Sequence, residues 1–183
     1  MRCDFRRAYS TKAVVVFIAD ARNPSAVGEP QRTIFEKMIL SQLADYKGKV
    51  ILVRGLPGSL INPSPSGLIV HSHLPADTLN RLVCGAALIL CRPGYSSVMD
   101  LLKLQKKCIF VPTPGQTEQE YLGNYLAERR LALCQPQSGF SLSHAITAAG
   151  QFPFVQPEPG DDLLQPAIAE WVRSLIPSSA VDG

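Results

Sequence analysis

A turn that follows the apolar run 86–91 combines residue types that can bind phosphate and ribose. Gly94 lets a ligand approach the backbone closely. The helical pattern that begins directly afterwards offers free N–H groups and the positive end of a helix dipole. Ser96 and Ser97 add hydroxyl donors. Asp100, one helical turn further on, can accept hydrogen bonds from the vicinal hydroxyls of a ribose.

The same turn also has an interpretation that needs no ligand. Ser96 or Ser97 can serve as the N-cap of the helix, with Asp100 as the acidic residue of a capping box. Because capping boxes are common, the turn by itself favours this second interpretation.

A second apolar run, 108–111, ends in a loop of different chemistry. The loop 112–120 holds Thr113, Gln116, Gln119 and Glu120, and it contains no lysine or arginine. Amides and carboxylates without cations suit sugar hydroxyls better than phosphate, because each hydroxyl both donates and accepts. Ligands of open α/β sheets bind at the carboxyl ends of the strands, so two successive strand ends of this kind predict one ligand site.

A third candidate segment lies between the first apolar run and its helix. Gly28 and the backbone N–H groups around it, together with Arg32, could meet a diphosphate. The alternative is an ordinary helix start, with Pro30 near the first turn.

These segments must be positioned by elements that alternate along the chain. Apolar runs indicate buried strands at residues 13–19, 50–53, 68–70, 86–91, 108–111 and 131–134. Helical spacing indicates helices at residues 35–46, 75–82, 96–104, 117–128 and 141–149. The alternation predicts an α/β fold, a single Rossmann-like doubly wound parallel sheet of about six strands with helices on both faces.

The two ends of the chain differ from this alternating body, which we expect at residues 13–150. Residues 1–12 are predicted to be disordered or a linker, and residues 151–183 a linker and a C-terminal helix. That helix, at residues 163–175, is expected to bury five apolar side chains, Leu164, Ile168, Trp171, Val172 and Leu175.

The composition excludes several classes of function. With 183 residues, 46% of them hydrophobic, the chain can form one domain with a substantial core. A net charge of +3 is too small to indicate nucleic-acid binding. No apolar run approaches the roughly 20 residues that cross a membrane. No secretory signal is visible, so we expect a cytoplasmic protein.

The sequence offers no metal site and no hydrolase triad. The five cysteines include no C-x-x-C pair, and the close pair His71 and His73 lacks a third ligand. These histidines could line a nucleobase pocket or have no role, and His144, in an apolar helical pattern, is interpreted as structural. A Ser-His-Asp hydrolase is disfavoured because no G-x-S-x-G elbow exists.

The residues around the two strand ends resemble those of a known family. Residues 91–100, followed by Val111-Pro112 and Gln119-Glu120-Tyr121, look like the donor half of a two-Rossmann-domain (GT-B) glycosyltransferase. The bacterial N-acetylglucosaminyltransferases of the peptidoglycan lipid intermediate are closest in pattern. The donor subunit of the eukaryotic dolichol-linked N-acetylglucosamine transferase is similar. The resemblance covers residues 13–149, with its specific motifs in residues 68–124.

The resemblance implies a UDP-sugar donor, with UDP-N-acetylhexosamine as the expected class. Gly94, Ser96 and Ser97 match the phosphate-binding turn of the family. Asp100 matches the acidic residue that binds the ribose hydroxyls, although that residue is usually Glu. Leu74 matches the loop whose backbone contacts the uracil.

The sugar side of the site is implied in the same way. Gln119 and Glu120 match a pair that contacts the sugar hydroxyls, where the family often has two glutamines. Thr113 and Gln116 belong to the same donor-binding loop. The loop with Gly28 and Arg32 matches the glycine-rich phosphate loop, here displaced by an unusual insertion at residues 19–27.

The mechanism implied by the resemblance is inverting transfer without a bound metal. The helix N-terminus and the loop amides would stabilise the departing UDP. The general base belongs, in the family, to an N-terminal Rossmann domain that binds the acceptor. Since this chain has strands for one such unit, we expect an N-terminal acceptor domain or a separate partner subunit. Any membrane contact would come through that missing half.

Two other functions remain open from the sequence. A sugar-nucleotide epimerase of the UDP-N-acetylglucosamine 2-epimerase type shares the fold and has similar strand-end glycines. A non-catalytic module that binds nucleotide sugars is the second alternative.

Overall fold

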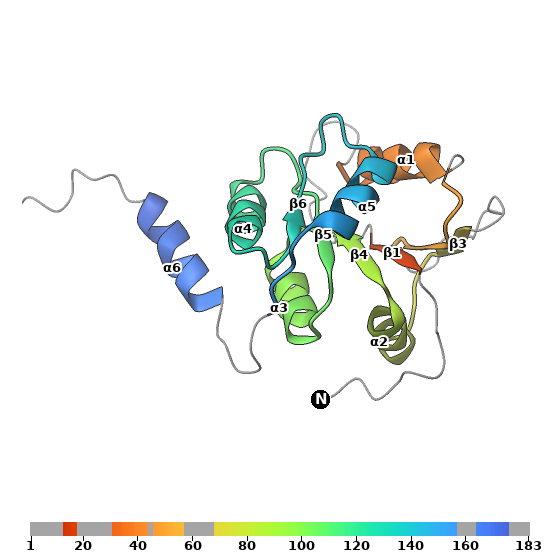
Figure 1. Cartoon of the computed structure of the whole chain (residues 1–183), viewed down its shortest axis with the longest axis horizontal. Helices are drawn as coiled ribbons and strands as arrows, with labels where there is room; N and C mark the ends of the chain where they lie inside the picture. The colour runs from red at the N-terminus through yellow and green to blue at the C-terminus, as the bar shows by residue number, and fades with distance from the viewer. Residues whose placement is uncertain (1–12, 18–30, 44–45, 57–67, 157–163, 176–183) are drawn as a thin grey trace, which may run out of the picture.

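The computed structural model describes residues 13–17, 31–43, 46–56, 68–156 and 164–175 (Figure 1). Its strands are β1 Val14–Phe17, β2 Val50–Val53, β3 Leu68–His71, β4 Leu88–Cys91, β5 Cys108–Phe110 and β6 Leu133–Cys134. Neighbouring strands all pair in parallel, in the order β3-β2-β1-β4-β5-β6. The predicted α/β class with parallel strands is confirmed. The order changes direction between β1 and β4, the place where such sheets bind ligands.

Helices cover both faces of the sheet. Those described are α1 Gln31–Leu43, α2 Ala76–Gly85, α3 Tyr95–Lys103, α4 Thr117–Glu128, α5 Leu142–Gln151 and α6 Leu164–Leu175. Buried side chains of α2, α3 and α4 form one apolar cluster with the sheet, and those of α1 and α5 form a second. The two clusters lie on opposite faces, so the sheet is wound on both sides (Figure 1).

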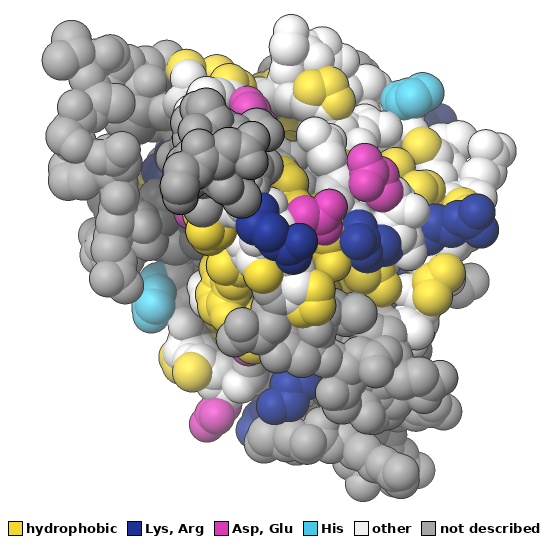
Figure 2. All heavy atoms as spheres, turned by 90° about the vertical axis from the view of Figure 1, so that its left-hand side faces the viewer, with side chains coloured by type: hydrophobic (Ala, Val, Ile, Leu, Met, Phe, Trp, Pro, Cys, Tyr) yellow, Lys and Arg dark blue, Asp and Glu magenta, His cyan; other side chains and the backbone are white. Residues whose placement is uncertain are grey.

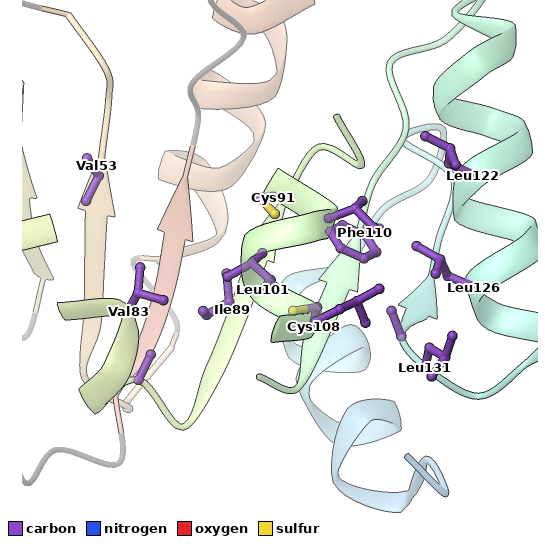
Figure 3. Close-up of a cluster of buried hydrophobic side chains, with 14 of the residues drawn as sticks. Val53, Val83, Ile89, Cys91, Leu101, Cys108, Phe110, Leu122, Leu126 and Leu131 are labelled. Atoms are coloured by element: carbon purple, nitrogen blue, oxygen red, sulfur yellow. The ribbon is translucent and has the colours of Figure 1, made fainter. Parts of the chain in front are cut away.

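Alternate residues of the central strands enter opposite clusters. In β4, Ile89 and Cys91 belong to the cluster drawn in Figure 3, whereas Leu90 belongs to the cluster of α1 and α5. In β5, Phe110 belongs to the first cluster and Ile109 to the second. Burial on both faces explains why these strands are apolar throughout rather than alternating.

β1 begins one residue later than predicted, and β4 and β6 each begin two residues later, the latter two for the same physical reason. β4 begins at Leu88 rather than at residue 86, because the N–H of Ala86 still bonds to the last turn of α2. β6 begins at Leu133 rather than at residue 131, because the N–H of Leu131 bonds to the end of α4. In both cases apolar residues directly after a helix look like the start of a strand in the sequence. Their N–H groups instead bond to carbonyls of the last helical turn.

Residues 152–156 form what we call the amino-edge strap. The turns that precede β5 and β6 contain residues with positive φ, Gln105 at 53° and Arg130 at 58°. The N–H of Val155 donates to the Arg130 carbonyl at 2.8 Å. The side chain of Gln156 donates to the Gln105 carbonyl at 3.1 Å. The strap therefore joins the two turns at the amino ends of these strands.

The C-terminal helix α6 lies against α4, where Arg129 and Glu170 form an ion pair at 3.8 Å. Ile168 and Trp171 are half-buried, but Val172 is 44% exposed, so the prediction that the helix buries Val172 is wrong. Among the described elements α6 packs mainly against α4, and one such contact covers only part of an apolar stripe. The side chains of Leu164 and Leu175 are not among those that the structure describes.

The face that carries α6 is mixed in charge. Figure 2 shows Lys and Arg side chains beside Asp, Glu and apolar ones on this face. Within the described parts of the chain, none of the helices has the length and apolar character needed to cross a membrane.

Candidate functional site

The turns after β4 and β5 leave the sheet side by side. Cys91 pairs with Phe110 in the parallel ladder, and the N–H of Val111 donates to the Cys91 carbonyl at 2.9 Å. Both turns therefore start at the carboxyl edge of the sheet, with β4 directly beside β1, where the strand order changes direction. The sequence predicts one ligand site at these two strand ends, and the structure places the two ends side by side.

The N-cap of α3 is Gly94, which has extended backbone (φ −74°, ψ 144°) and no side-chain cap. The capping-box alternative is therefore wrong, because Ser96 and Ser97 lie inside the first turn rather than at the cap. Both serines and Asp100 are exposed. A side chain at Gly94 would meet nothing within 4 Å, so the space in front of this residue is open.

The partial positive charge at the start of α3 is not neutralised by an acidic side chain of its first turn. The N–H groups of Tyr95, Ser96 and Ser97 precede the first hydrogen bond of the helix, in which the Val98 N–H donates to the Gly94 carbonyl at 2.9 Å. No acidic side chain lies in this first turn. As far as the described residues show, the dipole end and these N–H groups are therefore available to an anion from outside the chain.

The polar side chains of the loop after β5 bond to the loop itself. Gln119, only 8% exposed, accepts from the Thr113 N–H at 2.9 Å and donates to the Gln116 side chain. Glu120 is exposed and accepts from the Gly115 N–H at 3.0 Å. Gln119 thus holds the loop in shape, whereas, of the other predicted sugar contacts, Glu120 is exposed and Gln116 is half-buried.

Leu74, the predicted base contact, lies in the loop between β3 and α2. Its side chain is partly buried against the cluster of α2, α3 and α4. Nearby, Ser72 is 7% exposed and its hydroxyl has no hydrogen-bond partner among the described residues. His71 is half-buried and His73 exposed. Since β2 and β1 separate β3 from β4, Leu74 lies further along the carboxyl edge than the two loops.

Arg32 bonds to its own chain. Its guanidinium lies 3.1 Å from a carboxylate oxygen of Glu36 and donates to the Arg54 carbonyl at 2.8 Å. Arg54 donates to the other oxygen of Glu36, which is only 6% exposed. Two guanidinium groups share one buried carboxylate, so the cluster keeps one positive charge beside the start of α1. The i,i+4 spacing of Arg32 and Glu36 was the available sequence signal. Gly28 lies outside the described residues.

Sequence reasoning missed the role of Arg92. This residue is 4% exposed and donates to the carbonyls of Val111 at 2.8 Å and Pro112 at 2.9 Å. It also donates to the Gln137 side chain, and its guanidinium lies 4.1 Å from the centre of the Phe35 ring. The available signal was an arginine directly after a strand buried on both faces, since such a residue starts inside the protein.

Burial makes the thiols nearest the site difficult to ionise. Burial raises the pKa of Cys91 to about 12, against the opposing effect of Arg92, and raises the pKa of Cys134 to about 11. The pKa of Cys108 is raised for the same reason. A thiol must ionise to act as nucleophile or metal ligand. In the described ranges, no three His, Cys, Asp or Glu side chains gather as a metal site would require.

The comparisons with known proteins agree with this arrangement. Residues 73–151 match the glycosyltransferase family 28 C-terminal domain, a span that includes both strand-end turns. No curated protein matches the sequence. The resemblance to the C-terminal domain of GT-B glycosyltransferases is confirmed.

Several solved structures share the fold. MurG from Acinetobacter baumannii is 15% identical with a TM-score of 0.53, over 80% of this chain and 42% of that one. The glycosyltransferase VinC in complex with dTDP is 19% identical with a TM-score of 0.55, over 94% and 44%. SnogD from Streptomyces nogalater is 13% identical with a TM-score of 0.55, over 96% and 46%. The chain spans less than half the length of each.

Proposed function

We propose that this chain is the donor-binding half of an inverting glycosyltransferase. The starting point is the match of residues 73–151 to the glycosyltransferase family 28 C-terminal domain. The proposed donor is a UDP-sugar of the N-acetylhexosamine class. One observation carries the proposal: the open N-terminus of α3 and the polar loop after β5 lie at adjacent strand ends.

The two strand ends suit different parts of such a donor. The N–H groups at the start of α3, with Ser96 and Ser97, suit the diphosphate, and Asp100 on the same helix suits the ribose hydroxyls. Glu120 and Gln116 offer oxygen and amide groups to the sugar. The net charge of the Arg32, Arg54 and Glu36 cluster favours an anion at this edge.

The chemistry follows from where charge develops. When the bond between the sugar C1 and the diphosphate breaks, its electron pair stays on the leaving phosphate oxygen. Backbone N–H groups and a helix dipole that already point there stabilise this charge without reorganising. The proposal requires no resident metal for this step.

The other half of the reaction belongs outside this chain. A general base must take the proton from the acceptor hydroxyl, and we assign that base and the acceptor pocket to an N-terminal domain or a partner subunit. Nucleic acid is not a partner in this proposal. Membrane contact, if the acceptor is a lipid, would come through the other half, with this chain on the cytoplasmic side.

Calorimetric titration tests the proposal. The ligands are UDP, UDP-N-acetylglucosamine, dTDP and ADP, and dTDP is included because VinC was solved with it. We expect the uridine ligands to bind and ADP to bind more weakly, with little sugar transfer by the chain alone. Equal failure of all four ligands under native conditions would refute the donor site. If dTDP binds more tightly than UDP, the proposed donor site stands, but its nucleotide is thymidine rather than uridine diphosphate.

A further inference from the structure

The buried guanidinium of Arg92 joins the two loops beyond the last backbone bond between their strands, in which the Val111 N–H donates to the Cys91 carbonyl at 2.9 Å. Val111 and Pro112 begin the loop after β5, and their carbonyls accept from one nitrogen of Arg92 at 2.8 Å and 2.9 Å. Arg92 itself begins the turn after β4 that leads to Gly94 and α3. One side chain therefore fixes the start of the second loop relative to the first.

The anchor extends to a third segment. The other terminal nitrogen of Arg92 donates to the Gln137 side chain, whose amide donates to the Gln31 side chain at 3.0 Å. Gln31 is the first residue of α1, and Phe35 of the same helix lies under the guanidinium. The start of α1, the segment after β6 and the two strand-end turns thus meet at one buried group.

We propose that Arg92 is a positioning residue, which holds the loop after β5 in the place where it meets the sugar of the bound donor. This inference rests on the proposed function. The shape of the group supports it: a planar guanidinium donates in several fixed directions at once, which an ammonium or an apolar side chain of similar volume cannot do. Burial of such a charge is costly, so packing alone would favour an apolar residue.

The two turns depend on Arg92 to different degrees. The start of α3 is formed by its own helix, beginning with the bond from Val98 to Gly94. The loop after β5 leaves a strand only three residues long, and Gln119 closes it from the far side. Loss of Arg92 should therefore loosen the sugar side of the site and leave the phosphate and ribose side in place.

The test compares Arg92→Met and Arg92→Lys with wild type, and uses Arg129→Met as the matched control. Arg129 also contacts an aromatic ring, 3.5 Å from the centre of Tyr125, but it is exposed and pairs with Glu170. Calorimetry gives the affinities for UDP and for UDP-N-acetylglucosamine. Hydrogen exchange gives the protection of the amides of Thr113 and Gln116.

We expect Arg92→Met to weaken UDP-N-acetylglucosamine binding about tenfold more than UDP binding, and to speed exchange at Thr113 and Gln116. Arg92→Lys should fall between Arg92→Met and wild type, and it carries the test if Arg92→Met does not fold. Arg129→Met should change neither quantity.

Equal loss of both affinities, or unchanged loop exchange in a folded variant, would overturn the positioning role. If wild type binds none of the ligands, the proposed function fails. The exchange data then still decide whether Arg92 holds the loop.

Discussion

At the scale of single residues, a polar side chain can bind a ligand only if its hydrogen-bonding groups are not already used within the protein. Gln119 and Arg32 are the side chains that look most suited to a ligand, yet both are committed to their own chain. Asp100, Ser96 and Ser97 are exposed on α3, clear of its N-cap. The proposed donor site therefore has its direct contacts on α3 and on Glu120 and Gln116 of the loop, while Gln119 acts indirectly by holding the loop.

Asp100 gives the first prediction. Asp100→Asn should lower the affinity for UDP about tenfold, because a hydrogen bond to a charged group contributes about 1.5–3 kcal/mol. The melting temperature should stay unchanged, since the side chain is exposed. Calorimetry and thermal unfolding measure the two quantities, with Glu128→Gln at the exposed end of α4 as the control. Unchanged UDP affinity in Asp100→Asn would argue for a ligand site elsewhere.

Cys91 gives a prediction about pH. Because burial raises its pKa from 9.0 to about 12, the native thiol stays protonated at pH 8 and should resist iodoacetamide. Mass spectrometry after a labelling pulse should find Cys91 modified only once urea unfolds the chain.

The same shift affects stability. The unfolded chain loses the thiol proton near pH 9.0 and the native chain near pH 12. The unfolding free energy should therefore be unaffected below pH 9 and fall as the pH rises between these values. Rapid labelling of native Cys91 at pH 8 would contradict both expectations.

At the scale of elements, the proposed phosphate site lies at a helix start whose N-cap, Gly94, has no side-chain cap. Asp is a better N-cap than Gly and complements the dipole, so Gly94→Asp should raise the unfolding free energy by about 0.5 kcal/mol. The added carboxylate would stand where the phosphate binds, and UDP affinity should fall at least about tenfold.

Gly94→Asn separates these two effects, because Asn caps equally well without the charge. Denaturant unfolding and calorimetry measure the outcomes. A Gly94→Asp variant that binds UDP as wild type does would remove α3 from the site.

The glycine in α4 tests how tightly the loop after β5 is packed. A Cβ at Gly123 would lie 2.6 Å from the sulfur of Cys134 and 3.2 Å from Pro112. Gly123→Ala should destabilise the fold by about 1–3 kcal/mol. Gly150→Ala, in open space on α5, should instead stabilise it by about 0.5–1 kcal/mol. Urea midpoints compare the two variants, and equal midpoints would show that α4 has room to shift.

At the scale of the whole molecule, the alternation of apolar runs and amphipathic helices predicts the class of fold, because the central strands are buried on both faces. The short apolar runs that contain Ile89, Leu90 and Phe110 are typical of strands covered on both faces. The position of the site follows from the same pattern, since the carboxyl ends of parallel strands share one edge.

The details that the sequence does not yield depend on contacts between distant segments. Arginine is usually exposed, so the burial of Arg92 becomes visible only when Val111 and Gln137 converge on it. Gln119 turns inward because the N–H of Thr113 needs an acceptor. Val172 is exposed because α6, within the described residues, packs mainly against α4.

The amino-edge strap has a consequence for how this domain can change. It bonds to the turns at Gln105 and Arg130, at the ends of the strands opposite the ligand loops. Substitutions in the strap therefore act at the edge of the sheet opposite the proposed ligand loops. Selection can change the stability of the domain through these residues while the residues of the proposed donor site stay the same.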